Sequence, residues 1–185
     1  MKIFLFRHGK VRNPDEVLYG CLPNFHLSKE DRADVRKTSK YLKNENIKKI
    51  YSSPMERAQE TSLIIAEVLN LSKKNIKIIN DLTEANVMNW EGRKLTDFQN
   101  SEHRKNPRVT TDVEGMESSG CRVVNFLKEV VKFNENIVVV SHGDPIMGAV
   151  GLLSDKWDKT TGKYYIEKGN FIEIEITNDI WKVIR

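Results

Sequence analysis

The sequence predicts one α/β domain over residues 1–185: a three-layer α/β/α sandwich with a largely parallel central sheet and an antiparallel edge strand or hairpin. Three observations support this fold class. Residues 3–6 and 137–140 are wholly apolar, as is typical of strands covered on both faces. Strand and helix patterns alternate along the chain, which is typical of parallel sheets. Residues 172–176 alternate isoleucine with glutamate, as a half-solvated strand does.

Composition narrows the function classes. The 185 residues suit one domain with a core of its own. Thirty Lys+Arg against 26 Asp+Glu give a net charge of +4, and no basic arm is present, so we expect a small anionic partner and no nucleic acid. No apolar run approaches the roughly 18 residues of a membrane span, and the first residues lack the apolar region of a signal peptide. Cys21 and Cys121 are far apart, so we expect reduced thiols, a cytoplasmic location and no metal cluster. A monomer and a homodimer fit equally well.

The first predicted strand, residues 3–6, leads into a loop over residues 10–27 that contains two prolines. A helix is predicted next, capped by Ser28 and running to about Lys43. Asp31, three residues after the cap, is expected to complete a capping box. The apolar face of this helix is expected to contain Val35, Tyr41 and Leu42.

A second strand is predicted over residues 47–51, followed at once by a helix. Ser53 is the expected cap, Pro54 the first helical residue, and Glu56 the partner in a capping box. Arg57 then lies in the first turn of that helix. The residues expected on its inner face recur at helical spacing: Ala58, Thr61, Ile65 and Val68.

A third strand is predicted over residues 76–79, with Glu84 in the loop that follows. Residues 100–115 are polar and without period, which indicates a surface loop or lid. The next amphipathic helix is marked by Val123, Phe126, Leu127, Val130 and Val131.

The buried strand 137–140 ends at Ser141-His142-Gly143, and Asp144-Pro145 is expected to begin the next helix. Asn178-Asp179 is expected to turn strand 172–176 into a last strand over residues 181–184, which would make the edge hairpin.

Five ionisable residues follow the predicted strands. In parallel sheets, ligands bind beyond the carboxyl ends of the strands, so these side chains are expected to converge at one sheet edge. They are Arg7 and His8 after the first strand, Arg57 after the second, Glu84 after the third and His142 after the fourth.

This set indicates phosphoryl chemistry. Guanidinium groups bind phosphate through paired hydrogen bonds, and the helix starts at Pro54 and Pro145 add unpaired N–H groups. No acidic cluster suited to Mg²⁺ and no Gly-rich phosphate loop is visible in the sequence, so a side chain is the expected nucleophile. A neutral histidine can attack phosphorus. Glu84 is the candidate general acid and then base, provided that burial raises its pKa.

Four ordered motifs resemble the histidine phosphatase (phosphoglycerate-mutase-like) superfamily, and we assign the chain to its phosphatase branch. The first is Arg7-His8-Gly9, with residues 19–28 resembling the loop into the first helix. The others are residues 52–61 (SSPMERAQET), residues 82–92 (LTEANVMNWEG) and residues 140–145 (VSHGDP). They occur in the family's order and span nearly the whole chain.

The resemblance implies a role for each residue. His8 would be the nucleophile that forms a phosphohistidine, and Glu84 the proton donor and acceptor. Asn13 is a further candidate phosphate contact, although it lies one residue closer to His8 than in the commonest family form. Neither a metal nor another cofactor is implied, and the expected substrate is a small phosphorylated metabolite. The residues expected to hold that substrate are Arg7, Arg57, His142 and Gly143, with Lys10 beside them.

The chain departs from the family pattern at four positions without losing a catalytic group. Lys10 stands where Glu is frequent, Val11 where Thr is common, Asp31 where Gly is usual, and Met88 where Gly often precedes Trp-Glu-Gly. Lys10 and Met88 are expected near the pocket rim. We hypothesise that Lys10, Arg12 and the basic stretch 103–108 select substrates with a second anionic group.

Three alternatives stay open. A phosphoglycerate mutase would return the phosphoryl group to substrate, but mutases resembling this family generally have extra segments over the site. A silent phosphate-binding module would not need both His8 and Glu84. Zinc bound by His8, Glu84 and His142 is disfavoured, because no compact ligand spacing is present and two arginines would repel the cation.

Overall fold

A computed structural model describes residues 1–101, 113–154 and 165–184, and within them it contains a six-stranded sheet of order β3-β2-β4-β1-β5-β6. The four parallel strands are β1 (Lys2–Arg7), β2 (Lys49–Ser52), β3 (Ile76–Ile78) and β4 (Ile137–Ser141). β5 (Phe171–Thr177) and β6 (Ile180–Val183) add an antiparallel hairpin at the edge. The predicted fold class is confirmed.

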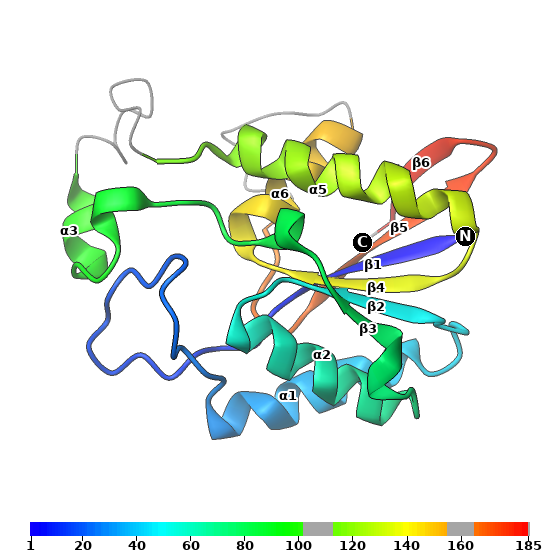
Figure 1. The fold of residues 1–185 in the computed structure, drawn as a ribbon, viewed down its shortest axis with the longest axis horizontal. Coiled ribbons are helices and arrows are strands. Elements are labelled where there is room, and N and C mark those ends of the chain that lie inside the picture. Colours follow the sequence, from blue (N-terminus) through cyan, green and yellow to red (C-terminus); the bar gives the residue numbers. More distant parts are fainter. Residues whose placement is uncertain (102–112, 155–164, 185) are drawn as a thin grey trace.

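Helices cover both faces of the sheet (Figure 1). α1 (Lys29–Ser39) and α2 (Glu56–Val68) lie on one face, and α5 (Met116–Val130) and α6 (Gly143–Leu153) on the other. Alternate residues of β1 divide between two cores: Ile3 and Leu5 pack under α5 and α6, whereas Phe4 and Phe6 pack toward α1 and α2. The shorter helical elements are α3 (Leu95–Asn100), η1 (Lys40–Leu42), η2 (Lys73–Asn75), η3 (Asn80–Leu82), η4 (Met88–Trp90) and η5 (Val131–Phe133).

At the carboxyl edge of the sheet, main-chain hydrogen bonds continue for one residue beyond the ends of β1 and β2. Arg7 pairs with Ser141, and the His8 N–H continues the ladder by donating to the Ser141 carbonyl at 3.1 Å. On the other side of β4, the Ser53 N–H donates to the Val140 carbonyl at 2.9 Å. Because main-chain bonds fix these three chain segments together, the residues that follow them start from fixed positions.

Two predicted helix starts need correction. Ser28 caps α1 as expected, accepting from the Asp31 N–H at 3.1 Å, but the Asp31 carboxylate accepts from the Lys10 N–H and closes no capping box. α2 begins at Glu56 after Met55, not at Pro54 after a Ser53 cap. The Ser53 hydroxyl lies before the helix, where it accepts from the Met55 N–H at 3.3 Å and is also hydrogen-bonded to His142, so it serves both the turn into α2 and the site.

Smaller differences concern the ends of elements. α1 ends at Ser39 and continues as the 3-10 turn η1, and Tyr41, predicted on the apolar face, is 72% exposed. The edge strand is Ile180–Val183 and not 181–184. Of the polar stretch 100–115, residues 102–112 lie outside the described residues. No helix among the described residues is both long enough and apolar enough to cross a bilayer.

Candidate active site

Arg57 lies at the centre of the site, in the first turn of α2. Its side chain is 0% exposed. Nε donates to His8 Nε2 at 3.3 Å, while Nη2 donates to His142 Nδ1 at 3.2 Å and to the Gly20 carbonyl at 2.8 Å. The ring of Tyr19 covers the guanidinium at 4.8 Å. One cation therefore joins both histidines, as the predicted convergence requires.

His8 is held in its neutral form. Its Nδ1 lies 2.6 Å from the Gly9 carbonyl, so we assign the proton to Nδ1, which leaves the lone pair on Nε2. That lone pair accepts the hydrogen bond from Arg57. Burial, and then the charge of Arg57, hold the pKa of His8 well below its ordinary value. At neutral pH Nε2 is therefore unprotonated and faces the cationic part of the site.

His142 follows β4 and caps α6. Arg57 donates to its Nδ1, so we assign the proton to Nε2, which donates to Ser53 Oγ at 2.7 Å. Burial, and then Arg57, hold the pKa of His142 well below its ordinary value. The two imidazole rings lie edge to face with centroids 5.1 Å apart.

Glu84 reaches the site from the loop after η3. Its Oε2 lies 3.5 Å from His142 Nδ1, and its Oε1 accepts from the Ala85 N–H at 2.9 Å. The side chain is 18% exposed. Burial, and then the charge of Asp144, raise the pKa of Glu84 to about 7. Near neutral pH this carboxyl can therefore both give and take a proton.

Arg7 completes the cationic set from the end of β1. Its Nη1 donates to the Ile166 carbonyl at 2.7 Å. A methyl group on Gly143 would lie 3.0 Å from Arg7 Nη2, so glycine at the start of α6 lets the guanidinium approach closely. Arg7 Nε and Arg57 Nη1 are buried without a hydrogen-bond partner among the described residues. Buried donors of this kind are costly unless an acceptor meets them, and an oxyanion would do so.

Asn13 and Lys10, two further residues predicted to contact substrate, have other contacts in the structure. The Asn13 side chain bonds both main-chain groups of Val17, at 2.8 and 3.2 Å, and its phosphate contact stays a prediction. Lys10 lines a polar cavity of about 670 Å³ together with Tyr165 and Lys168. A substrate-binding role for Lys10 also stays a prediction, and its proposed basic partners at 103–108 lie outside the described residues.

Residues 3–185 match the model of the histidine phosphatase superfamily (branch 1). The chain belongs to this superfamily. It is 30% identical over 183 residues to the 2,3-bisphosphoglycerate-dependent phosphoglycerate mutase of Thermoplasma acidophilum, which covers 95% of this chain and 88% of the mutase. It is 28% identical over 158 residues to phosphoserine phosphatase 1 of Hydrogenobacter thermophilus, and this match covers 79% of this chain and 72% of that phosphatase. Its match to an uncharacterised Mycobacterium tuberculosis protein is 36% identical over 94 residues and spans 45% of that protein's length.

Solved structures of the superfamily share the fold. The alpha-ribazole phosphatase of Shigella flexneri superposes with a TM-score of 0.77 at 22% identity, covering 100% of this chain and 95% of that one. The phosphoserine phosphatase of Entamoeba histolytica superposes with a TM-score of 0.81 at 21% identity, again covering 100% and 95%.

Three residues of the site have contacts that the sequence does not predict. Ser53 was predicted as a helix cap, and its bond to His142 depends on the register between β2 and β4. Lys168 donates to the Tyr19 hydroxyl at 3.1 Å, yet it follows no strand and belongs to none of the superfamily motifs. Tyr19 was included in the loop motif without a role. The motifs include Ser53 and Tyr19 but not Lys168, and only the fold assigns the contacts of all three.

His8, Glu84 and His142 each present a ligand atom within 4.8 Å of the others, the arrangement that a metal site needs. However, Arg57 donates to both imidazoles. A cation bound there would have to displace a guanidinium that is itself positively charged. The position of Arg57 thus disfavours a metal at these three residues. That the protein needs no metal stays a prediction, which a chelator can test.

Proposed function

We propose that the protein is a metal-independent phosphatase that hydrolyses small phosphomonoesters through a phosphohistidine on His8. The observation that carries this proposal is the pairing of a buried, neutral His8 Nε2 with the Arg57 guanidinium. His8 keeps a lone pair on Nε2 for attack on phosphorus, and Arg57 lies beside it to bind the phosphoryl oxygens. The hydrogen bond from Arg57 Nε to Nε2 must break before that lone pair can attack.

The first step would be attack of His8 Nε2 on phosphorus, breaking the bond to the ester oxygen. Glu84 in its protonated form donates its proton to that leaving oxygen, and the alcohol departs. Arg7 and Arg57 balance the charge of the phosphoryl oxygens, using the N–H groups that have no partner within the described residues. Water then attacks the phosphohistidine, Glu84 takes the water's proton, and inorganic phosphate and neutral His8 are restored. A pKa of about 7 suits Glu84 to both directions of transfer.

Relatives support a hydrolase acting on small molecules. One curated relative is named phosphoserine phosphatase 1, and structural neighbours carry the names alpha-ribazole phosphatase and phosphoserine phosphatase. On this basis we propose a small phosphorylated metabolite as substrate, with neither a cofactor nor a nucleic acid or membrane as partner. Cys21 and Cys121 are both free thiols, which supports a cytoplasmic enzyme, as a monomer or homodimer.

The test is hydrolysis of p-nitrophenyl phosphate in the presence of EDTA, comparing wild type with His8→Ala. We expect activity that survives the chelator and is lost in the variant. A ³²P-labelled phosphomonoester should also leave an acid-labile label, the mark of a phosphohistidine, on wild type only. Activity abolished by EDTA would contradict the metal-independent mechanism. Absence of hydrolysis in wild type, with this compound and with a panel of natural phosphomonoesters, would contradict the phosphatase.

The second candidate is a phosphoglycerate mutase. The specific observation in its favour is 30% identity to the Thermoplasma acidophilum mutase over 95% of this chain. A mutase must keep its phosphoenzyme long enough to return the phosphoryl group to the substrate. Stimulation by a 2,3-bisphosphoglycerate primer and a phosphoenzyme that resists water for minutes would identify it, whereas rapid release of inorganic phosphate would identify the phosphatase.

A further inference from the structure

The segment that carries Glu84 has little regular structure to hold it. It lies between the 3-10 turns η3 and η4, and the preceding strand β3 is a three-residue edge strand. The Glu84 carboxylate itself receives a main-chain bond from the neighbouring Ala85. A general acid acts only from the correct position, so the backbone on both sides of Glu84 needs support from elsewhere.

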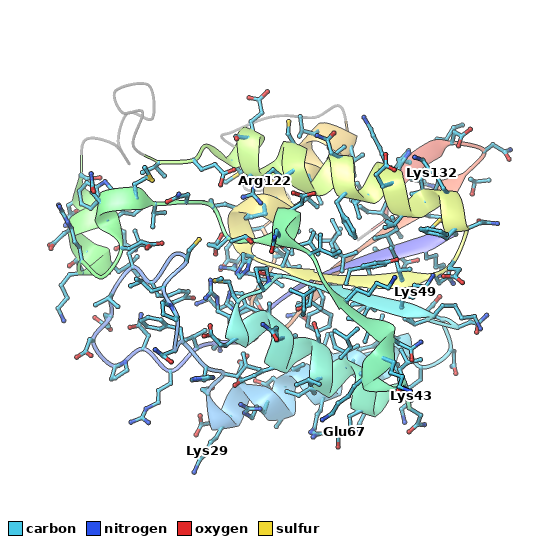
Figure 2. All side chains as sticks on the ribbon, in the orientation of Figure 1. Lys29, Lys43, Lys49, Glu67, Arg122 and Lys132 are labelled. Carbon is cyan, nitrogen blue, oxygen red and sulfur yellow. The ribbon has the colours of Figure 1, made fainter. Side chains whose placement is uncertain are left out.

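Arg122 supports the segment on the N-terminal side of Glu84. Figure 2 shows Arg122 on α5, beside the chain that runs from η3 toward η4. Its Nη1 donates to the Asp81 carbonyl at 2.7 Å, and Nη1 and Nη2 both lie 3.3 Å from the Thr83 carbonyl, to which they donate. Thr83 directly precedes Glu84, so these bonds fix the peptide from which the catalytic side chain departs.

Glu114 supports the other side. Its Oε2 accepts from the Asn86 N–H at 3.1 Å, and its own N–H donates to the Asn86 carbonyl at 2.7 Å. Arg122 binds this carboxylate with two parallel bonds, Nε to Oε1 and Nη2 to Oε2, both 2.8 Å long. Such bidentate pairs fix orientation as well as distance. Arg122 and Glu114 together therefore hold residues 83–86 from both ends.

The helix that carries Arg122, α5, is held firmly because it packs closely against α6. At two glycines the helices lie too close together for any side chain. A methyl group on Gly120 would lie 2.3 Å from the Gly148 carbonyl carbon, and one on Gly148 would lie 2.0 Å from the Met116 carbonyl oxygen. α6 begins directly after His142. The same two helices thus support His142 and, through Arg122, the segment of Glu84.

We propose that Arg122, paired with Glu114, is a positioning residue for proton transfer by Glu84. This inference rests on the proposed phosphatase function. Arg122 contacts carbonyls on one side of Glu84 and a carboxylate that holds the other side, so its hydrogen bonds act on the reaction through the place of the Glu84 carboxyl. After burial and the charge of Arg57, its own charge also lowers the pKa of His142, and Arg122→Lys keeps that charge. Lysine cannot replace it, because one ammonium group lacks the planar fork that reaches both targets.

The experiment compares two substrates of similar shape, phenyl phosphate and p-nitrophenyl phosphate, in Arg122→Lys and Glu114→Gln. Phenol is the poorer leaving group and depends on the proton from Glu84, whereas the acidic p-nitrophenol departs almost without it. We expect kcat/KM to fall about 10- to 100-fold for phenyl phosphate and less than about threefold for p-nitrophenyl phosphate, a share of what general acid catalysis supplies.

The matched control is Arg36→Lys, which alters an exposed ion pair with Glu67, 2.7 Å long, on the opposite face of the sheet. It should leave both substrates unaffected. Equal losses for the two substrates in Arg122→Lys and Glu114→Gln, or no loss in either, would overturn the inference while the phosphatase stands. If Arg122→Lys does not fold, the isosteric Glu114→Gln decides alone. A wild type without His8-dependent hydrolysis would overturn the proposed function instead.

Discussion

Two halves of the site are held in different ways. The sheet half consists of five residues at the carboxyl edge of the sheet, and main-chain bonds extend the ladder to two of them, His8 and Ser53. Arg7 ends β1, His8 follows it, Ser53 follows β2, Arg57 lies in the first turn of α2, and His142 follows β4. The loop half consists of Tyr19, Glu84 and Lys168, which side-chain bonds hold in place. On the proposed function, the sheet half carries the groups that would contact a phosphoryl group, and the loop half the groups that would face the rest of the substrate.

The difference indicates a division of labour. Phosphoryl groups are the same in every phosphomonoester, and a rigid sheet edge can be built to fit them. Leaving groups differ, and loops can change without disturbing the sheet. When a residue of the sheet half is substituted, the loss of kcat/KM should therefore be the same for every leaving group. When a residue of the loop half is substituted, the loss should depend on the leaving group.

The largest effect is expected in the sheet half, for Arg57→Met. The variant loses the cation that contacts both histidines, and kcat/KM should fall about 10³-fold or more, the range typical of an arginine that stabilises phosphoryl transfer. The fall in kcat/KM should be the same for phenyl phosphate and for p-nitrophenyl phosphate. Steady-state kinetics on the two substrates measures this, and a loss confined to one of them would contradict the division.

Glu84→Gln should give the next largest effect and should depend on the leaving group. We expect kcat/KM for phenyl phosphate to fall about 10²- to 10⁴-fold, with a smaller loss for p-nitrophenyl phosphate. In wild type, kcat/KM for phenyl phosphate should decline as pH rises through about 7, because Glu84 loses the proton that it must donate. The variant should lack this decline in its pH profile, and retention of the decline would assign it to another group.

Ser53→Ala should have an intermediate effect, again equal for both substrates. It removes the oxygen that accepts from His142 Nε2 at 2.7 Å and leaves a buried donor unpaired. A buried hydrogen bond of about 1–1.5 kcal/mol corresponds to roughly a tenfold loss in kcat/KM. The control is Ser62→Ala, which removes a buried hydroxyl farther along α2 that bonds the Ala58 carbonyl. A similar loss in that control would attribute the effect to α2 and not to His142.

The smallest effect is expected for Tyr19→Phe in the loop half. The ring over Arg57 is retained, and the hydroxyl that accepts from Lys168 is lost. One partly buried hydrogen bond implies a change of about two- to fivefold, which should be seen in KM and not in kcat. A change in kcat as large as the change in KM would place Tyr19 with the catalytic groups, and it would weaken the distinction between the sheet half and the loop half.

Apart from Ser53, the sheet half could be predicted from the sequence because its signals are periodic and local. The apolar runs at 3–6 and 137–140 locate two central strands, and a residue that directly follows a parallel strand can lie only at one edge. Arg7, His8, Arg57 and His142 were placed together on this ground, and the structure brings them together.

The loop half could be predicted only in part, because its contacts join residues far apart in the sequence. Lys168 and Tyr19 are separated by 149 positions, and Arg122 and Thr83 by 39. The same reason explains the error at Ser53: local rules favoured a helix cap, but its hydroxyl bonds a histidine 89 positions away. Side-chain contacts at such separations depend on the complete topology.

Arg57 has one further consequence, which concerns release of the product. Its guanidinium already bonds His8 Nε2, His142 Nδ1 and the Gly20 carbonyl. Inorganic phosphate left after hydrolysis would find Nη1 without a partner among the described residues, but it would have to compete with these three internal acceptors for the N–H groups of Nε and Nη2. Only the difference between the two sets of bonds counts toward retention of the ion. If Arg57 gathers the oxyanion as proposed, it would therefore also limit how tightly the spent ion is held, which would favour rapid turnover over product inhibition.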